Sequence, residues 1–435
     1  MFPVSLTGLH AMPAPLVSIT LVSLMLWTGL CSAGLAPEET AIATAARTRA
    51  GAAEALFEKA VNIPSPTENV AGVRAVGELF AGEFRRIGMQ TRWIDMPADM
   101  KRAGHLVATT GGSRGKRVLM LGHMDTVLSG EGFRREGAIA HGTGSDDMKG
   151  GLVVMLLALQ AMADAGVLAE SRVTVMLTGD EEDVGIPLET SRGPMIDLAK
   201  EADVLLGFEA SVDGTATIGR RGAGSWTLQT RGETGHSSQV FSADKGSGAI
   251  YEAARILEAF RSELGGERYL TINPSVIVGG TTATMDDIAG SAQGKTNVIA
   301  PVAIARGDIR FISIDQERSA RERMQAIVAR HAPRTGATLV FHESYPAMTP
   351  TPANEALLAQ LDAASRDLGQ GPVEALDPGK RGAGDIGFVA HLAPGLDGLG
   401  SAGGKNAHAP GEFTDITSLL PMASRTAILL HRLSR

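Results

Sequence analysis

The sequence predicts an α/β protein in which helices flank a mixed, mainly parallel sheet, with a smaller α+β domain inserted into the chain. Short apolar runs at 117–121, 172–177 and 203–208 have the length of buried strands, and the longer apolar segment 150–165 has the length of a helix. Strands that alternate with helices favour a parallel sheet.

Length and charge narrow the possibilities further. A chain of 435 residues is too long for one ordinary core, so we expect two domains. Hydrophobic residues make up 44% of the chain and charged residues 20%, which is typical of a globular protein. The formal net charge is −8 and no basic patch stands out, so we do not expect nucleic acid or an anionic membrane as a partner.

The N-terminal segment 1–33 is predicted to be a signal peptide, so we expect a periplasmic or secreted protein. Its apolar stretch, 15–27, is short for a membrane-spanning helix and is followed by small residues up to Ala33, after which cleavage is expected. Two alternatives are a lipoprotein lipidated at Cys31, which the bulky Leu30 disfavours, and an uncleaved anchor. Cys31 is the only cysteine, so the mature chain has no disulfide and no thiolate metal ligand.

The remaining elements follow in order along the chain. The larger domain is expected to begin at 37, to be interrupted by the insert 215–332, and to resume over 333–435. Within the insert, 225–230 alternates between polar and apolar residues like an antiparallel strand. The other predicted helices are 38–59, 69–87, 248–264, 315–331, 353–368 and 414–433, and the other predicted strands are 270–278, 298–311 and 338–342.

Acidic and histidine residues follow the predicted strands of the larger domain. His123 and Asp125 follow the first strand, Glu181 and Glu182 the second, and Glu209 the third. Chemistry in such sheets gathers beyond the carboxyl ends of the strands. Imidazole and carboxylate groups are ligands for zinc, and one shared carboxylate can bridge two ions. The remaining candidate ligands are Asp147, as the bridging carboxylate, and His408.

Each candidate also has a purely structural interpretation. His123 alone could be a turn histidine, Asp146 or Asp147 a helix N-cap, and the acidic run 180–183 a solvated turn. Glu209 and His408 could lie on the surface. The shared position at strand ends and the order along the chain favour one site. Because adjacent side chains point in different directions, we assign Glu181 to proton transfer and Glu182 to metal binding.

These motifs together resemble the M20 family of metallopeptidases, most closely its glutamate carboxypeptidase-like branch, which is related to aminoacylases. The segments G-H-M-D-T-V (122–127), D-M-K-G-G (147–151) and G-D-E-E (179–182) carry the resemblance, which runs from about residue 50 to the C-terminus. It implies a zinc-peptidase-like catalytic domain, over 37–214 and 333–435, and a dimerisation or lid domain in the insert. It also implies a cis peptide bond between Asp147 and Met148.

The resemblance also implies a site with two Zn²⁺ ions per subunit. His123 and Glu209 bind one ion, Glu182 and His408 bind the other, and Asp147 bridges them. Asp125 supports His123, and Glu181 is the general base and acid. The expected reaction is attack of a metal-bound hydroxide on the amide bond of a small peptide or N-acyl amino acid that has a free C-terminal carboxylate.

The insert contributes three further candidates through the resemblance. His236, in the segment G-H-S-S (235–238), would reach the partner subunit's site in a homodimer and stabilise the oxyanion. Asn297 and Arg310 would bind substrate. Each also has a structural alternative: His236 could be a turn residue, Asn297 a helix cap, and Arg310 part of a solvated strand face.

One loop departs from the family pattern. The family's Gly-Gly-Ser/Thr-Asp appears here as 382–385, G-A-G-D, without the hydroxyl, and it is preceded by Lys380 and Arg381. Either cation could bind a carboxylate or simply be exposed loop charge. The departure leaves the substrate open, so an N-acyl amino acid deacylase is an alternative. A non-catalytic exported binding protein is a further one.

Overall fold

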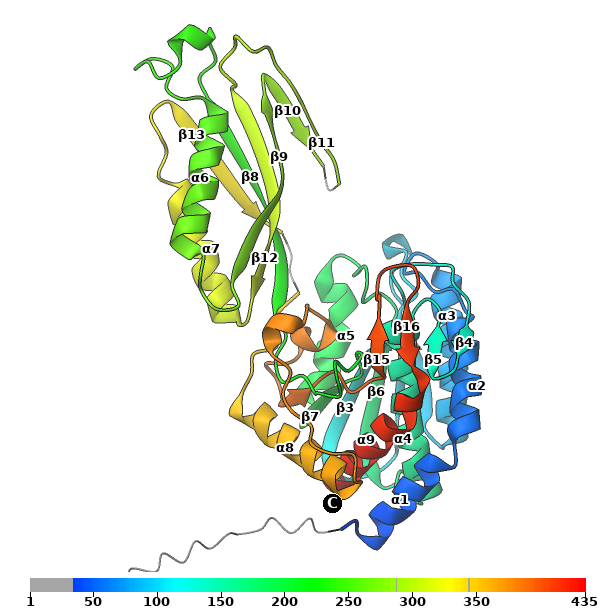
Figure 1. Ribbon diagram of the computed structural model, residues 1–435. Helices are drawn as coiled ribbons and strands as arrows, with labels where there is room; N and C mark the ends of the chain where they lie inside the picture. The colour runs from blue at the N-terminus through cyan, green and yellow to red at the C-terminus, as the bar shows by residue number, and fades with distance from the viewer. Residues whose placement is uncertain (1–33, 287, 343–344) are drawn as a thin grey trace, which may run out of the picture. The chain divides into compact units, whose positions relative to one another are not determined.

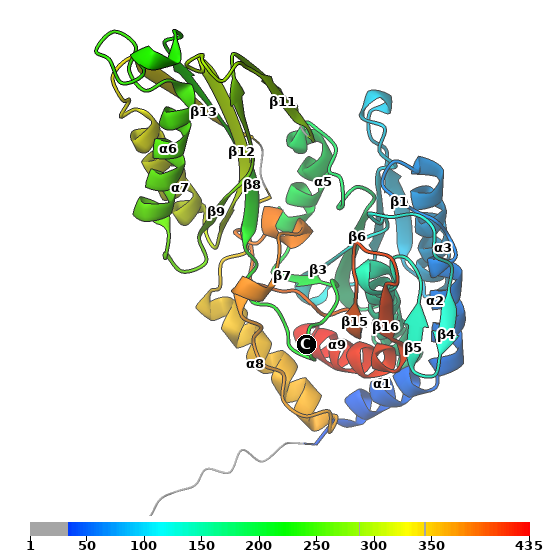
Figure 2. The ribbon, with the colours of Figure 1, turned by 45° about the horizontal axis from the view of Figure 1, so that its top comes forward.

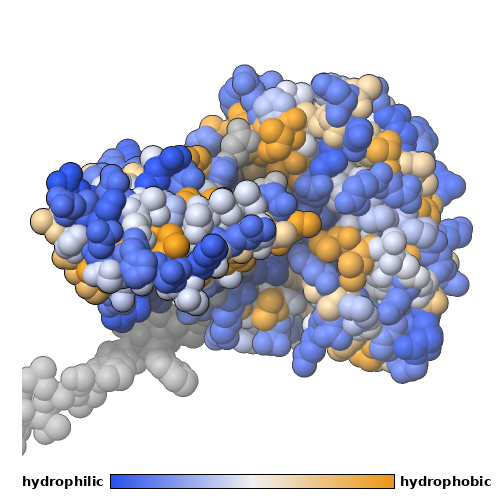
Figure 3. All heavy atoms as spheres, turned by 90° about the horizontal axis from the view of Figure 1, so that it is seen from above, coloured by the Kyte–Doolittle hydropathy of each residue, from blue (hydrophilic) through white to orange (hydrophobic). Residues whose placement is uncertain are grey.

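The computed structural model describes residues 34–286, 288–342 and 345–435, so the predicted signal peptide lies outside the described residues. Helices surround a six-stranded sheet, and a second sheet carries helices of its own (Figure 1), which confirms the predicted fold class. The surface mixes hydrophilic and hydrophobic residues on the face seen in Figure 3. In the described part of the chain, no helix combines the length and the apolar character needed to cross a membrane.

The six-stranded sheet is mixed, and its parallel part contains β3, which ends at His123. β3 pairs in parallel with β6 and β7, and β7 with β14, whereas β1 and β2 join antiparallel at the β6 side. The strands are β1 (Gln90–Ile94), β2 (His105–Thr109), β3 (Arg114–His123), β6 (Ser171–Thr178), β7 (Val204–Gly207) and β14 (Gly395–Leu396).

The helix α4 (Gly150–Asp164) lies at the centre of the largest hydrophobic core. It is apolar on all sides and almost completely buried, as expected of a helix with no solvent-facing stripe. Gly151 allows its close approach to the sheet, because a Cβ there would lie 1.9 Å from the backbone oxygen of Phe208. The other helices of this part are α1 (Pro37–Arg47), α2 (Ala50–Val61), α3 (Val70–Arg86), α5 (Leu188–Lys200), α8 (Pro352–Asp367) and α9 (Leu419–Leu433).

The insert forms an antiparallel four-stranded sheet in the order β13-β8-β12-β9. α6 and α7 cover the same face of it (Figure 2) and enclose a separate core that includes Trp226, Ile256 and Met324. A short hairpin of β10 and β11 follows β9. The elements are β8 (Gly222–Gly232), α6 (Ala249–Leu264), β9 (Thr271–Gly280), β10 (Thr282–Met285), β11 (Gly290–Gln293), β12 (Val302–Phe311), α7 (Ile314–Val328) and β13 (Thr335–Phe341).

The edges of this sheet differ from the predicted domain boundaries. β13, which we placed in the second part of the larger domain, pairs with β8 opposite Leu228 through Leu339, and both leucines enter the insert's core. Segment 215–221, which we placed in the insert, forms isolated bridges with residues of the larger domain, Thr217 with Asp397 and Arg220 with Met348. The change in sequence pattern near residue 215 therefore lies several residues before the insert begins in the structure, at β8.

Two helix predictions also need correction. The predicted helix 38–59 is two helices, α1 and α2, because α1 ends at its cap Thr48 and Arg49 leaves helical geometry. The predicted helix 414–433 begins at Leu419, since residues before it form a strand in a small antiparallel sheet that we did not predict. That sheet contains β15 (Ala402–Lys405), β16 (Phe413–Asp415), β5 (Ile139–His141) and β4 (Arg134–Glu136).

Candidate metal centre

The parallel strands bring the predicted ligands to one edge of the sheet. β3 lies between β6 and β7, with His123 opposite Thr178 and Leu121 opposite Gly207. Since β6 and β7 end at this level, the loops that carry Glu181, Glu182 and Glu209 start beside His123. The predicted clustering at strand ends is therefore found in the structure.

Asp147 faces an imidazole with each of its two oxygens. Its Oδ1 lies 3.1 Å from His123 Nε2, and its Oδ2 lies 3.1 Å from His408 Nε2. Glu209 Oε1 lies 3.6 Å from His123 Nε2, and Glu182 Oε2 lies 3.1 Å from His408 Nε2. The five side chains thus form two ligand groups that share Asp147.

The charges of this cluster favour bound cations. Burial, with the nearby charge of Asp147, raises the pKa of Glu209 to about 7. Hydrogen bonds to Asp147 and Glu182 raise the pKa of His408 to about 11. Burial and the surrounding acids raise the pKa of Glu181 well above its usual range.

One buried atom also lacks a partner. Glu182 Oε1 is buried and accepts no hydrogen bond within the described chain. Buried carboxylate oxygens normally have a partner, and a metal ion would satisfy this one. Two histidines and three carboxylates with one shared aspartate are a nitrogen and oxygen donor set that fits two divalent cations.

Asp125 has a wider role than we predicted. His123 Nδ1 lies 3.0 Å from the backbone oxygen of Asp125 and 3.5 Å from its carboxylate, so the imidazole is oriented mainly by the backbone. The carboxylate accepts backbone N–H groups of Glu181 and Glu182, each at 3.1 Å, and the Thr67 hydroxyl at 2.7 Å. Asp125 therefore holds the loop that carries both glutamates.

Glu412 is a buried residue of this site that the sequence analysis missed. Its carboxylate accepts the backbone N–H groups of Gly144, Asp146 and Asp147 at 2.7, 2.8 and 2.9 Å. It therefore fixes the loop that carries the bridging aspartate. The peptide bond from Asp147 to Met148 in this loop is cis, as the resemblance implied. The only feature of the sequence that could have pointed to Glu412 is its position four residues after His408.

A buried arginine supports the other side of the glutamate loop. Arg192 pairs with Asp180 at 2.7 Å and with Asp385 at 2.8 Å, and all three side chains are almost fully buried. The hydroxyl of Tyr345 donates to the backbone oxygen of Glu181 at 2.6 Å. Position along the sequence gave no reason to connect these four residues.

The three candidates from the insert lie outside this cluster. His236 Nδ1 contacts Ser238 Oγ at 2.8 Å, and the residue is exposed. Asn297 is exposed and its backbone oxygen accepts from Ser237, and Arg310 donates to Asp308 at 2.8 Å. Their predicted roles involve a partner subunit or a substrate and stay predictions.

Comparisons with known proteins agree with this geometry. The model of the family described as Peptidase family M20/M25/M40 matches residues 119–432. Carboxypeptidase G2 of Pseudomonas sp. (strain RS-16) is 30% identical over 208 residues, which are 46% of this chain and 49% of that protein. The chain thus spans about half the length of that relative.

Other similarities cover more of the chain. A succinyl-diaminopimelate desuccinylase of Gluconacetobacter diazotrophicus is 26% identical over 392 residues, 86% of this chain and 94% of that one. A tripeptidase structure from Staphylococcus aureus superposes with a TM-score of 0.68 at 20% identity, covering 89% and 99% of the two chains. A dinuclear metal-binding M20 peptidase of Bacillus subtilis gives 0.62 at 14% identity, covering 89% and 99%. These structures show the same fold.

Proposed function

The chain belongs to peptidase family M20/M25/M40, and from this premise we propose that it is a dinuclear zinc hydrolase. It cleaves the amide bond of small peptides or N-acyl amino acids that have a free C-terminal carboxylate. The observation that carries the proposal is Asp147, whose two oxygens each face one histidine of a separate ligand group.

We assign the residues of the site to two roles, metal binding and proton transfer. His123 and Glu209 would hold one ion, His408 and Glu182 the other, and Asp147 would contact both. Bound zinc supplies a more acidic water and polarises the scissile carbonyl. Glu181 lies beside Glu182 on a loop held by Asp125, and we assign its carboxylate to take a proton from the attacking water and return it to the leaving amine.

The names of the relatives support two substrate classes. One relative is a carboxypeptidase, and several others are desuccinylases, which remove an acyl group. A deacylase acting on N-acyl amino acids is therefore our second candidate function. Both reactions hydrolyse an amide next to a carboxylate, for which we propose Asn297 and Arg310 as binding residues.

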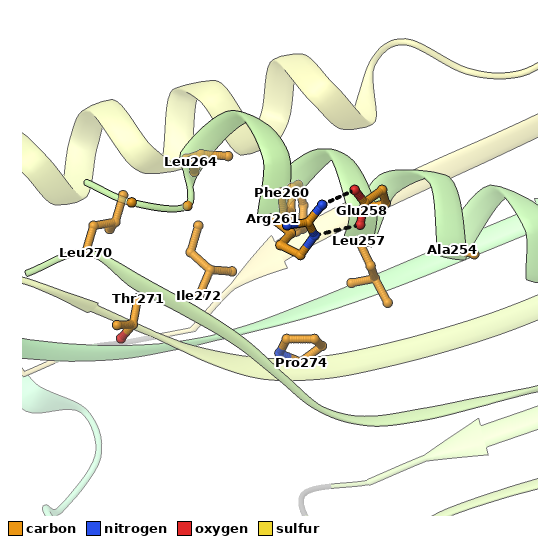
Figure 4. Close-up of a pocket in the computed structure, with 12 residues that line it drawn as sticks. Ala254, Leu257, Glu258, Phe260, Arg261, Leu264, Leu270, Thr271, Ile272 and Pro274 are labelled. Carbon is orange, nitrogen blue, oxygen red and sulfur yellow. Dashed lines mark hydrogen bonds and ion pairs between the residues drawn. The ribbon is translucent and has the colours of Figure 1, made fainter. Parts of the chain in front are cut away.

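We further propose a homodimer formed through the β9 edge of the insert. β9 has a neighbour in the sheet on only one side, and Val276 and Ile277 on it are 41% and 51% exposed. A groove of about 560 Å³ lies between α6 and β9, lined by apolar side chains such as Leu257 and Ile272 (Figure 4). Exposed edge strands pair readily with a second chain, and an identical edge makes a symmetric partner. In this dimer His236 would serve the partner subunit's site.

The dimer has a matched test. Val276→Lys on the β9 edge should give a monomer in light scattering and should lower activity as His236→Ala does. Val340→Lys changes an exposed valine, at 53%, on β13 at the opposite edge and should leave the dimer intact. A Val276→Lys protein that stays dimeric and active contradicts the proposal.

We also propose export through the signal peptide 1–33, on the sequence alone.

The catalytic proposal is tested with the purified protein on N-acyl amino acids, dipeptides and folate-like glutamates. We expect two zinc ions per chain by elemental analysis, loss of hydrolysis with a chelator, and recovery with zinc. Glu181→Gln should reduce kcat by roughly 10²- to 10⁴-fold, the usual contribution of general acid–base catalysis. Glu189→Gln, an exposed glutamate on α5, is the control. Hydrolysis that survives Glu181→Gln would contradict the assigned role.

A further inference from the structure

Arg381 lies beside the candidate metal centre without a carboxylate partner. Its Nη2 donates to the backbone oxygen of Ala210, the residue after Glu209, and its Nε lies 3.4 Å from the Thr217 hydroxyl. No ion pair joins it to an acid among the described residues, and none of these residues accepts from its Nη1. A guanidinium has five N–H donors, so most of this group's capacity is unused.

The nearby acids are already committed to other groups. Asp397 pairs with Arg220, whose other nitrogens donate to the backbone oxygens of Gly382 and Ala383. Glu209 faces His123. Burial lowers the pKa of Arg381, and the positive charge of Arg220 lowers it further. Arg381 is thus a half-buried cation with no directly paired carboxylate among the described residues, and burying a charge unpaired is costly.

The backbone around Arg381 leaves room for this side chain. Gly398 has a positive φ of 70°, and a Cβ there would lie 3.1 Å from Arg381 Nη2 and 3.0 Å from Thr217 Oγ1. Glycines follow Arg381 at 382 and 384, so the loop has little side-chain bulk. The hydrogen bond to Ala210, the residue after Glu209, places the guanidinium beside the metal centre, and Glu209 and Asp147 are among the acids that act on its pKa.

We propose that Arg381 determines specificity by binding a second carboxylate of the substrate. This inference rests on the proposed function and deepens it, since that function already requires a C-terminal carboxylate, for which Arg310 and Asn297 are the candidates. The preferred substrates are therefore amides with an additional acidic group. That group belongs either to the acyl part, as in the monoamide of a dicarboxylic acid, or to an acidic amino-acid side chain. Arginine suits this role because its planar fork binds a carboxylate through two parallel hydrogen bonds.

The test compares substrates that differ by one carboxylate. N-succinyl-alanine against N-butyryl-alanine isolates the acyl side, and N-acetyl-glutamate against N-acetyl-glutamine isolates the side chain. Arg381→Met should lower kcat/KM for the acidic member of one pair by roughly 10- to 100-fold, the usual effect of losing a hydrogen bond to a charged group. The neutral member should change less than about threefold, and the pair that responds identifies the source of the carboxylate.

Controls separate recognition from structural support. Lys380→Met removes the same charge from the exposed neighbouring residue and should change neither pair. Arg381→Lys should keep part of the preference, because it retains the charge and loses the fork. An equal loss on acidic and neutral members after Arg381→Met overturns the proposal, since it means that Arg381 only supports the Ala210 backbone.

A binding measurement keeps this test independent of catalysis. Calorimetry of the zinc-containing protein with succinate, glutarate and glutamate should show a dicarboxylate that binds at least tenfold more weakly after Arg381→Met, with acetate unaffected. If none of the amides is hydrolysed but this difference is present, the proposed reaction fails and the anion site stands. If amides are hydrolysed and neither the binding nor the substrate preference depends on Arg381, the site fails and the reaction stands.

Discussion

Replacing Glu412 by glutamine tests whether the loop of the bridging aspartate is held from the C-terminal part of the chain. One Glu412 oxygen accepts from Asp146 and Asp147, and the other accepts from Gly144, all between 2.7 and 2.9 Å. A glutamine amide keeps one acceptor oxygen and turns an NH₂ group toward the remaining N–H. At least one charge-assisted hydrogen bond is lost and the other two become neutral bonds.

The expected size follows from these contacts. A hydrogen bond to a charged group contributes about 1.5–3 kcal/mol and a neutral one about 1, so losing one such bond and weakening two amounts to about 2.5–7 kcal/mol. Burial raises the pKa of Glu412, so the variant also avoids the cost of burying this charge. Glu412→Gln should therefore lower the free energy of unfolding by an amount near the lower end, about 2–3 kcal/mol. Because supports of metal ligands typically affect affinity by about 10–100-fold, zinc should also bind that much more weakly.

The assay combines two measurements on the same preparations. Urea unfolding of the metal-free protein reports the stability change, and competition with a zinc-binding dye reports the affinity. Glu374→Gln, an exposed glutamate, is the matched control and should change neither quantity. A Glu412→Gln protein that unfolds at the wild-type urea concentration and binds zinc with wild-type affinity refutes the reasoning.

Three further changes test the fold. The hydrogen bond from Arg432 lowers the pKa of Glu39. The stability that this bond adds is therefore present above the pKa of Glu39 in the unfolded chain and is lost as the pH falls through its pKa in the folded protein. Glu39→Gln should lower the free energy of unfolding in urea by about 1–2 kcal/mol at pH 7 and by clearly less at pH 3.5. Gly151→Ala should destabilise, because its Cβ has no space, whereas Gly82→Ala in α3, with open space around it, should stabilise by about 0.5–1 kcal/mol; equal thermal shifts would contradict this. Arg192→Met should cost about 3–5 kcal/mol by leaving two aspartates buried without their cation, and a wild-type melting temperature would argue against that ion pair.

The sequence was informative where local pattern and chemistry coincide. The apolar runs before His123, Glu181 and Glu209 are strands β3, β6 and β7, and their parallel order brings the polar residues together. Apolar content is a local property, so strand ends could be located without knowledge of the fold. Sheet geometry then accounts for His123, Glu182 and Glu209, whereas Asp147 and His408 lie on loops outside these strands.

Residues that act across long sequence distances could not be found in this way. Glu412 binds backbone groups 265 to 268 residues away, and Arg192 joins acids of two separate loops. β16 and β5 each have three residues, too few for a recognisable alternation. β13 follows α7 directly, and only its pairing with β8 reveals which sheet it joins. Such partners depend on the assembled tertiary structure.

The pairing of β16 with β5 also has a consequence for biosynthesis. A chain still leaving the ribosome already contains His123, Asp147 and both glutamates after β6, but it lacks His408 and Glu412 until the segment 402–415 emerges. Until then the loop of Asp147 has no acceptor for its N–H groups, and one ligand group is missing its imidazole. Closing so long a loop comes late in folding. In the proposed function, tight binding of both metal ions would therefore mark a chain in which β16 has paired with β5.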